Sequence, residues 1–407
     1  MKYDVIIIGG GQAGLTTSVS LRQNHFTGSV LLVGDEDQLP YQRPPLSKDF
    51  LYKEINEDRL LLKPKAFFDK KNIDYLRGSR VVSIHRDKKY IRLANQKKFS
   101  YGKLVICTGS SINKLRLKCS SNNIHYLRTI EDSKQIKSTL QAVKKIVILG
   151  AGYIGLEIAS AAISQGLDVT VVELQKRVMN RSLSTYASSF MKKKHQESGV
   201  KFLFGSAVED IEDEDGKKKI ICRDEANILA DAVIIGVGIK PNIGLAIKSG
   251  LDCEDGILVN KFSQTSDKNI YSSGDCANHP SQIYKQRLRL ESVQNAVEQS
   301  KIVAASITGS KIEYNEVPWF WSNQYNINLK IAGIASSKFE TIIRGNMSEE
   351  KFAVYYLHNN RLKAIETIND QKSFMLGKKL IRSQNFIADN LINNESIDIR
   401  DWIKKIP

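Results

Sequence analysis

A glycine-rich turn between an apolar strand and a helix rich in small residues occurs twice in this 407-residue chain. The two copies read YDVIIIGGGQAGLTTSVSLRQ and KKIVILGAGYIGLEIASAAISQG, and their GxGxxG glycines are Gly9, Gly11 and Gly14 in the first and Gly150, Gly152 and Gly155 in the second. In such a turn the first glycine permits the tight bend, the second lets backbone approach a pyrophosphate, and the third lets helix pack on strand. The helix N-terminus offers free N–H groups to the anion. Two copies predict an α/β protein with two dinucleotide-binding modules.

An acidic residue follows the next strand of each module. The strand SVLLVGDE offers Asp35 and Glu36 to a ribose, with Asp35 the better candidate, and DVTVVE ends in Glu173. A carboxylate there accepts hydrogen bonds from a ribose 2′-OH and repels a 2′-phosphate, which favours NADH over NADPH. Arg177 and Arg181 lie close enough in sequence to leave NADPH open. We therefore expect a resident flavin in the first module and a visiting nicotinamide in the second.

Two later apolar strands, in YGKLVICTGS and ADAVIIGVGIKPN, end in small, glycine-bearing turns and close the two modules. A third segment, NIYSSGDCANHP, places Asp275 at a strand end, beside the polar chain of a flavin nucleotide. A Gly-Asp pair alone is more often a simple turn. After two nucleotide modules, it indicates a further flavin contact.

The segment PYQRPPLSKDF holds an arginine, a serine and a lysine among three prolines. Proline fixes φ and lacks an N–H, so we expect a stiff, extended turn that cannot begin a helix before Leu46. The plain alternative is a proline-rich connector without a role.

The charge of +16, from 60 Lys and Arg against 44 Asp and Glu, favours an acidic partner, nucleic acid or an anionic surface. The longest basic runs, KKK at 192–194 and 217–219, are short, and no basic tail is visible.

Five cysteines without CxxC or CxxxxC spacing argue against a disulfide framework, and six scattered histidines argue against a metal site. The first strand begins near Met1, which leaves no room for a targeting peptide, so we expect a cytoplasmic protein. The apolar stretch 146–163 is expected to be strand, turn and helix.

Several motifs together resemble a known family: PYQRPPLSK, GAGYIGLE, YSSGDCA, RLESVQNAVEQ and VPWFWSNQYNINLKIAG. They are similar to the NADH-dependent FAD ferredoxin reductases of bacterial oxygenase and cytochrome P450 systems, of which putidaredoxin reductase and biphenyl dioxygenase ferredoxin reductase are typical. Apoptosis-inducing factor is a more distant relative. The resemblance covers the whole chain and implies a glutathione-reductase-like fold. It implies an FAD domain (1–113 and 240–316), an NADH domain (114–239) and a C-terminal α+β domain (317–407).

The resemblance also implies the activity. A tightly bound FAD would take a hydride from NADH and pass single electrons to an acidic 2Fe–2S ferredoxin, without nucleic acid or membrane partners. The protein would be a monomer or a weak homodimer. Disulfide reductases of this fold carry a redox CxxxxC at the flavin, where this chain has PPLSK. A one-electron protein acceptor is therefore the natural outlet for the flavin.

Catalytic roles implied by the resemblance fall on Lys48, at the flavin N5/O4 edge, on its partner Glu157, and on Glu291, which would receive the nicotinamide carboxamide. The implied FAD contacts are Gly9, Gly11, Ala13, Gly14, Asp35, Glu36, Arg43, Pro45, Lys48, Val81, Thr108, Gly109, Arg128, Asp275, Val293 and Trp321. The implied NAD contacts are Gly150, Gly152, Tyr153, Ile154, Gly155, Glu157, Glu173, Arg181 and Gly238. The alternative for both glutamates is an ordinary salt bridge, and for Trp319 and Trp321 it is packing between domains.

Other functions compete with this one. The chain could be an NADH-sensing flavoprotein like apoptosis-inducing factor, which would gain from a basic tail or stripe. It could also be a rubredoxin reductase or a component of nitrite reduction, and the WFWSNQ segment makes these two less favoured.

Overall fold

The computed structural model describes residues 1–120, 122–223, 227–387, 391, 394 and 396. The chain divides into two compact units. Unit 1 contains Met1–Gln42, Asn56–Ser111 and Lys240–Phe320, and unit 2 contains Arg43–Ile55, Ile112–Ile239 and Trp321–Pro407. The division into FAD, NADH and C-terminal domains stays a prediction.

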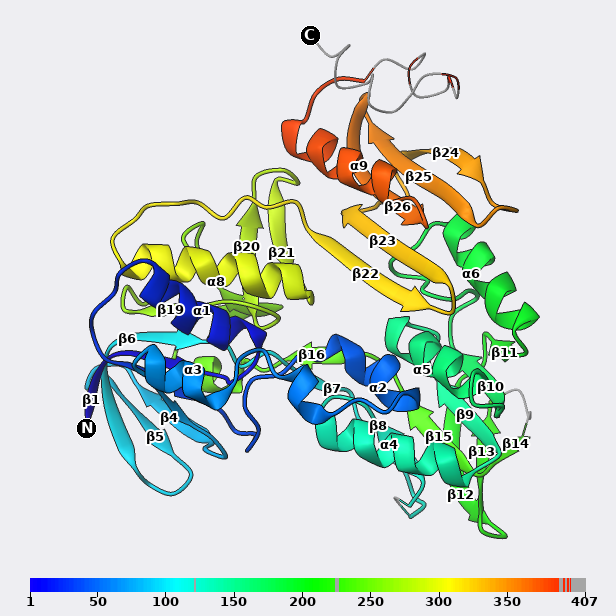
Figure 1. The fold of residues 1–407 in the computed structure, drawn as a ribbon, viewed down its shortest axis with the longest axis horizontal. Helices are drawn as coiled ribbons and strands as arrows, with labels where there is room; N and C mark the ends of the chain where they lie inside the picture. Colours follow the sequence, from blue (N-terminus) through cyan, green and yellow to red (C-terminus); the bar gives the residue numbers. More distant parts are fainter. Residues whose placement is uncertain (121, 224–226, 388–390, 392–393, 395, 397–407) are drawn as a thin grey trace. The chain divides into compact units, whose positions relative to one another are not determined.

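Unit 1 is built on a seven-stranded sheet in which β3, β2, β1, β6, β5 and β4 are neighbours in that order and β19 pairs with β6 (Figure 1). The central strands are parallel and apolar, as is typical of strands covered on both faces. Alternate residues of β1 enter separate cores, Val5 and Ile7 in one and Ile6 and Ile8 in the other. The strands are β1 (Lys2–Ile8), β2 (Val30–Val33), β3 (Ile73–Leu76), β4 (Val81–His85), β5 (Tyr90–Leu93), β6 (Lys98–Ile106) and β19 (Ile270–Ser272).

Helices and a small second sheet complete unit 1. Helix α1 packs against α8, and the Ser300 hydroxyl of α8 donates to the Ala13 carbonyl of α1 at 2.9 Å. The second sheet has the order β17-β18-β20-β21. The elements are α1 (Gln12–Gln23), η2 (Glu57–Leu60), α3 (Lys65–Lys70), α7 (Gly244–Lys248), α8 (Val293–Ile307), β17 (Cys253–Glu254), β18 (Gly256–Leu258), β20 (Ala277–Ser281) and β21 (Gln286–Arg289).

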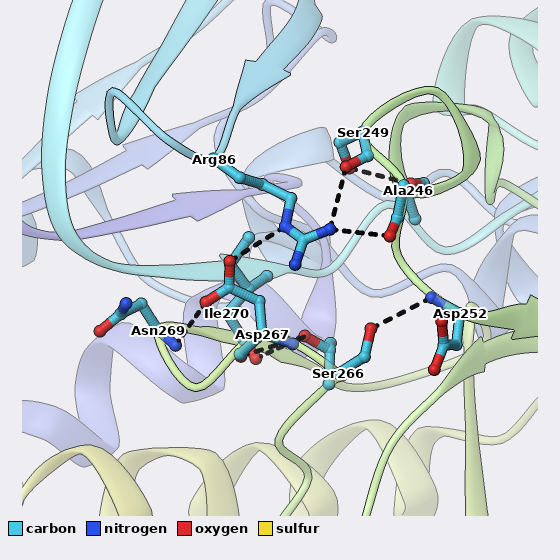
Figure 2. A network of polar contacts seen from close by, with 10 residues as sticks. Arg86, Ala246, Ser249, Asp252, Ser266, Asp267, Asn269 and Ile270 are labelled. Atoms are coloured by element: carbon cyan, nitrogen blue, oxygen red, sulfur yellow. Dashed lines mark hydrogen bonds and ion pairs between the residues drawn. The ribbon is translucent and has the colours of Figure 1, made fainter.

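Arg86 ties two distant chain segments of unit 1 together (Figure 2). Its guanidinium donates to the Asp267 carboxylate at 3.0 Å and to the carbonyls of Ser249 at 3.3 Å and Gly250 at 2.7 Å. Burial alone would raise the pKa of Asp267. The N–H of Asn269 and the guanidinium of Arg86 outweigh burial and lower that pKa below its ordinary value.

We expect Arg86→Met to destabilise unit 1 by roughly 1–3 kcal/mol, because the change leaves a half-buried carboxylate and two carbonyls without their donor. Since the pKa of Asp267 is lowered in the fold, its contribution is present at neutral pH and lost as the pH falls through that lowered pKa. The decrease in the free energy of unfolding caused by Arg86→Met should therefore become smaller at acidic pH. Urea unfolding followed by circular dichroism measures both effects.

The control for this prediction is Lys301→Met, which removes an exposed pair with Glu298 on α8, where the side chains are 51% and 34% exposed. It should change stability by less than about 0.5 kcal/mol. Equal stabilities of the Arg86 and Lys301 variants would contradict a structural role for the Arg86 network.

Unit 2 contains a five-stranded sheet in the order β11-β10-β9-β15-β8, and its pairings are parallel. A three-stranded antiparallel sheet, β12-β13-β14, lies in the same part of the chain. The elements are β8 (Ile124–Tyr126), α4 (Ile130–Ala142), β9 (Lys145–Leu149), α5 (Tyr153–Ile163), β10 (Asp168–Glu173), α6 (Thr185–Glu197), β11 (Lys201–Phe204), β12 (Val208–Glu214), β13 (Lys217–Cys222), β14 (Asn227–Ala230) and β15 (Ala232–Ile235).

The last part of unit 2 is an antiparallel sheet, β22-β23-β26-β25-β24, against which α9 packs through β26 and β23. The elements are β22 (Trp319–Gln324), β23 (Ile327–Gly333), β24 (Glu340–Asn346), β25 (Lys351–His358), β26 (Arg361–Ile368) and α9 (Gln371–Ser383). This sheet and helix confirm the expected C-terminal α+β region. The short strands β7 (Ser110–Ile112) and β16 (Ile239–Pro241) occur where the chain passes from one unit to the other.

The proline-rich segment differs from the expectation. A 3-10 helix, η1, runs from Pro44 to Ser47 and is followed by α2 (Asp49–Tyr52), so the prediction that no helix begins before Leu46 is wrong. Pro44 and Pro45 occupy the first turn, where the missing N–H groups would have no helical partner and the fixed φ already suits a helix. The prolines therefore start a turn of 3-10 helix, which ends at Ser47, directly before Lys48.

The apolar stretch 146–163 is β9, a glycine turn and α5, as predicted. Across the described ranges, no helix has the length and apolar character needed to cross a membrane.

Candidate functional site

The first glycine loop joins β1 to α1 and has the shape of a phosphate cradle. A Cβ on Gly9 (φ 118°) would lie 2.1 Å from the Cys107 carbonyl oxygen, and one on Gly14 would lie 1.9 Å from the Gly9 carbonyl oxygen. A Cβ on Gly11 would meet no atom within 4 Å. The first and third glycines are therefore required by the fold itself, whereas the second borders open space of the kind that a pyrophosphate needs.

The second loop, between β9 and α5, repeats this geometry. A Cβ would lie 2.5 Å from the Gly236 carbonyl oxygen at Gly150 and 2.1 Å from the Gly150 carbonyl oxygen at Gly155, but it would meet nothing within 4 Å at Gly152. The same pattern in two loops fits two dinucleotides.

The helices that follow the two loops also differ from the other long helices. Gly11 caps α1 and Gly152 caps α5, and neither helix has a side-chain cap. Side chains do cap α4, α6, α8 and α9, through Thr129, Ser184, Ser292 and Asp370. The first N–H groups of α1 and α5 are thus the ones suited to bind an anion.

Most of the remaining FAD candidates of unit 1 follow parallel strands, at the edge where ligands of such sheets bind, whereas Val81 and Val293 do not. Asp35 is exposed just beyond β2, and Glu36 accepts a hydrogen bond from the Tyr41 hydroxyl at 2.5 Å. Asp275 follows β19 and accepts from the Ser110 hydroxyl at 2.7 Å. The others are Ala13 in the first turn of α1, Val81 at the start of β4, Thr108 and Gly109 after β6, and Val293 at the start of α8.

Glu291 is engaged in an ion pair within unit 1. Its carboxylate lies 2.5 Å from Nη1 of Arg289, whose Nε also pairs with Asp255 at 2.8 Å. The salt bridge considered as the alternative is therefore present, and contact with the nicotinamide stays a prediction.

The predicted ribose contact Glu173 ends β10 and faces the second glycine loop. Its carboxylate accepts from the N–H of Ala151 at 2.6 Å and from the N–H of Gln175 at 2.8 Å. Arg177, which left NADPH open, uses its guanidinium to bind the carbonyls of Asn180, Leu183 and Ser184. The loop therefore presents a fixed carboxylate, while one of the two arginines holds the backbone of the next turn.

Other predicted NAD contacts surround the same loop. Arg181 lies near Gly238, since a Cβ on that glycine would lie 3.6 Å from Nη2 of Arg181. Ile154 is 42% exposed at the start of α5, and burial raises the pKa of the neighbouring Tyr153 hydroxyl. The NAD roles of these residues stay predictions.

Lys48 and Glu157 form the most constrained charged pair of the predicted site. Nζ of Lys48 lies 2.8 Å from Oε1 of Glu157, a residue that is only 2% exposed. The Ser322 hydroxyl donates to the same oxygen at 2.5 Å, and the Ser47 hydroxyl donates to Oε2. The pairing expected from the resemblance is present, and η1, α5 and β22 hold it in one place.

Four more predicted FAD contacts belong to unit 2. Arg43 precedes η1 and donates to the Arg128 carbonyl at 2.6 Å, Pro45 lies within η1, and Trp321 is a partly buried residue of β22. The structure thus brings Arg43 and Arg128 together, and their contacts with a flavin remain predictions.

Sequence reasoning missed Ser47 and Ser322, which donate hydrogen bonds to Glu157. It also missed Gln324 and His195, which continue the hydrogen bonding from Ser322. Gln324 donates to the Ser322 hydroxyl at 3.0 Å, and His195 contacts Gln324 at 2.7 Å. The WFWSNQ motif contains Ser322 and Gln324, but nothing local connects it to a histidine 129 residues earlier.

Within the described ranges, no cluster of three or more His, Cys, Asp or Glu side chains could hold a metal ion. The five cysteines have free thiols, and burial raises the pKa of the Cys107 thiol to about 12. Such a thiol is a poor nucleophile.

Comparison with known proteins also indicates a protein that binds two dinucleotides. The family model described as pyridine nucleotide-disulphide oxidoreductase matches residues 3–300, and the model described as reductase C-terminal matches residues 319–403. Rhodocoxin reductase of Rhodococcus erythropolis is 38% identical over 383 residues, which are 93% of this chain and 90% of that protein. Putidaredoxin reductase CamA of Pseudomonas putida is 35% identical over 407 residues, with 98% and 96% covered.

A solved structure is similarly close. The reductase in the covalent putidaredoxin reductase–putidaredoxin complex superimposes with a TM-score of 0.95 at 35% identity, covering 99% of this chain and 98% of that one. Together with the loop geometry, these matches support binding of FAD and NAD(H). The chain belongs to the pyridine nucleotide-disulphide oxidoreductase family and, within it, to the ferredoxin reductases, which are flavoprotein oxidoreductases.

Proposed function

We propose that this protein takes a hydride from NADH on a tightly bound FAD and passes single electrons to a 2Fe–2S ferredoxin that supplies an oxygenase or a cytochrome P450. The observation that carries the proposal is the pair of glycine loops. In each, the first and third glycines are packed against backbone while the second faces open space, in front of a helix that has no side-chain cap. Unit 1 would hold FAD and unit 2 would bind NADH.

The residues of unit 1 that would hold FAD supply the contacts which such a nucleotide requires. The N–H groups at the start of α1 would bind the pyrophosphate, and Asp35 beyond β2 would accept from a ribose hydroxyl. When bound, the flavin supplies the capacity to accept two electrons together and release them singly.

Lys48 would stabilise negative charge that develops next to it. Its ammonium is fixed by Glu157 at 2.8 Å and by the Pro44 carbonyl at 3.3 Å. Among the described residues these are its two hydrogen-bond partners, which leaves one N–H of the ammonium for a ligand. A cation that is already in place needs no reorganisation during electron transfer, so its stabilisation is fully available.

For the acceptor, we propose an acidic 2Fe–2S ferredoxin. The related reductase was solved in complex with putidaredoxin. The charge of +16 on this chain would steer an acidic partner toward it. We further propose that the protein acts in the cytoplasm as a monomer or weak homodimer.

The hydride donor tests the proposal. We expect kcat/KM to be higher with NADH than with NADPH, because the Glu173 carboxylate, fixed by two backbone N–H groups, would repel a 2′-phosphate. Glu173→Ala should lower kcat/KM for NADH by roughly tenfold, which corresponds to one lost hydrogen bond to a charged group. It should raise kcat/KM for NADPH, because the charge that repels the 2′-phosphate is removed. Steady-state kinetics with both nucleotides measures the change.

The matched control is Glu197→Ala, which removes a carboxylate at the end of α6 that pairs with Lys193 and is 60% exposed. Both efficiencies should stay at the wild-type value in this variant. Equal use of NADH and NADPH by the wild type would show that Glu173 does not discriminate between them.

A further inference from the structure

A series of buried hydrogen bonds leads away from the Glu157 carboxylate through unit 2. Oε1 of Glu157 accepts from the Ser322 hydroxyl at 2.5 Å, and Nε2 of Gln324 donates to the Ser322 oxygen at 3.0 Å. Nε2 of His195 lies 2.7 Å from Oε1 of Gln324, and the Tyr325 hydroxyl lies 3.0 Å from Nδ1 of His195. The side chains come from three parts of unit 2 that are distant in sequence: α5, α6, and β22 with the turn that follows it.

The interior members of the series are almost completely shielded from water. Ser322 and His195 are 0% exposed, and Gln324 is 2% exposed. A buried polar group without a partner costs about 1–3 kcal/mol, so each of these side chains must use the partners just described.

The carboxylate fixes the direction of every bond in the series. A carboxylate in an ion pair only accepts, so the Ser322 hydroxyl donates to Glu157 and must accept from Gln324. The amide of Gln324 therefore turns its NH₂ toward Ser322 and its oxygen toward His195. That oxygen requires an N–H at Nε2 of His195, which leaves Nδ1 to accept from the Tyr325 hydroxyl.

The surroundings of His195 suit a neutral ring with one N–H. Burial lowers the pKa of His195 to about 4, and the rings of Phe202 and Tyr325 stand edge-on to it at 6.2 and 4.9 Å. Burial also raises the pKa of the Tyr325 hydroxyl to about 12, so this group remains a donor. The Tyr325 hydroxyl is thus the donor, and Nδ1 of His195 the acceptor, of the hydrogen bond that joins them at neutral pH.

Tyr325 is held in an unfavourable backbone conformation. Its φ is 53°, in the left-handed region that bulky residues rarely adopt, at a cost of roughly 1–2 kcal/mol. Its N–H donates to the Ser160 hydroxyl of α5 at 3.0 Å, and its hydroxyl reaches His195. These two contacts anchor the turn directly after β22, the strand that carries Ser322 and Gln324.

We propose that Tyr325, His195, Gln324 and Ser322 form one directional hydrogen-bond chain that holds the Glu157 carboxylate in the orientation in which it binds Lys48. His195 and Gln324 are positioning residues. The hydrogen-bond chain fixes the orientation of the Glu157 carboxylate. It does not transfer a proton, because the amide of Gln324 cannot relay one. The effect on catalysis rests on the proposed function of the Lys48–Glu157 pair, whereas the direction of the chain does not.

The direction is tested by NMR of the holoenzyme labelled with ¹⁵N-histidine, which contains six histidines. The signal of His195, identified by its loss in His195→Gln, should show a protonated Nε2 and a bare Nδ1 at neutral pH. Gln324→Glu should convert His195 to the doubly protonated form, because a carboxylate at this position would pair with it. A wild-type His195 protonated at Nδ1 instead would overturn the proposal.

Stopped-flow reduction by NADH tests the positioning role. In Gln324→Glu the new carboxylate accepts from both His195 and Ser322, so Ser322 turns away from Glu157. This variant and His195→Phe should slow the limiting rate by roughly fivefold or more, as expected for a misplaced group, with the NADH Kd unchanged. His195→Gln keeps the donor to Gln324 and should stay within about twofold of wild type.

The control is His358→Phe, since His358 is exposed at the end of β25 and its ring lies tilted to that of Phe339, with 5.3 Å between the ring centroids. If Glu157→Gln slows reduction while Gln324→Glu and His195→Phe match wild type, the proposed function stands and the positioning role is wrong. If Glu157→Gln also has no effect, the proposed role of the pair fails, and the ¹⁵N spectrum alone decides the direction of the chain.

Discussion

A Gly11→Val variant is expected to fold and to lose its FAD. Gly11 has φ −88° and ψ −163°, which valine adopts readily, and a Cβ there meets no protein atom within 4 Å. The side chain would instead fill the space in which the pyrophosphate binds the N–H groups of α1. Losing two or more charge-assisted hydrogen bonds of about 1.5–3 kcal/mol each should weaken FAD binding by roughly a thousandfold.

The measurement is the absorbance of the purified protein at flavin wavelengths, together with its circular dichroism. The variant should be colourless with a wild-type secondary-structure spectrum. Gly244→Val is the control, because a Cβ at this first residue of α7 also meets nothing within 4 Å and lies outside the glycine loop. A yellow Gly11→Val protein would contradict the claim that the pyrophosphate of FAD binds at the first glycine loop.

Glu157→Gln is expected to slow the reduction of bound flavin by NADH by roughly a hundredfold, the loss that a displacement of about 1 Å can cause. The amide has nearly the same shape but presents an NH₂ to Lys48, to Ser47 or to Ser322, all of which donate to the carboxylate in the wild type. Lys48 would then lose the charge that fixes it. FAD should stay bound, because the FAD contacts of the glycine loop lie on other residues.

Anaerobic stopped-flow spectroscopy measures this rate, and FAD content and thermal unfolding check the fold. Glu131→Gln on α4 is the control, since its pair with Lys134 is exposed. A reduction rate in Glu157→Gln equal to that of Glu131→Gln would return Glu157 to the role of an ordinary buried ion pair.

The parts of the fold that the sequence predicts well depend on local signals. Each glycine loop contains its own strand, turn and helix, and Gly9 and Gly150 both take the positive φ that only glycine adopts without strain. The acidic residue at the end of the next strand follows from the same motif. Such features need no knowledge of residues far away in the chain.

The parts that the sequence did not predict depend on competing local rules or on distant partners. Pro44 and Pro45 restrict the residue before them, yet they also suit the first turn of a helix, and the second effect prevails in η1. The contact of His195 with Gln324 joins residues 129 positions apart. A buried histidine on a helix carries no pattern that distinguishes it from a surface one.

The most direct test of the central claim is a two-step anaerobic experiment on the FAD-loaded protein. NADH should first bleach the flavin, and mixing with an oxidised 2Fe–2S ferredoxin, with putidaredoxin as the first probe, should then reduce the ferredoxin one electron at a time. Cytochrome c reduction should require the added ferredoxin, and its rate at low ferredoxin should fall as salt screens the charges, over about 10 Å at 0.1 M salt. Flavin that NADH bleaches but only oxygen or a rubredoxin reoxidises, across a panel of 2Fe–2S ferredoxins, would contradict the claim.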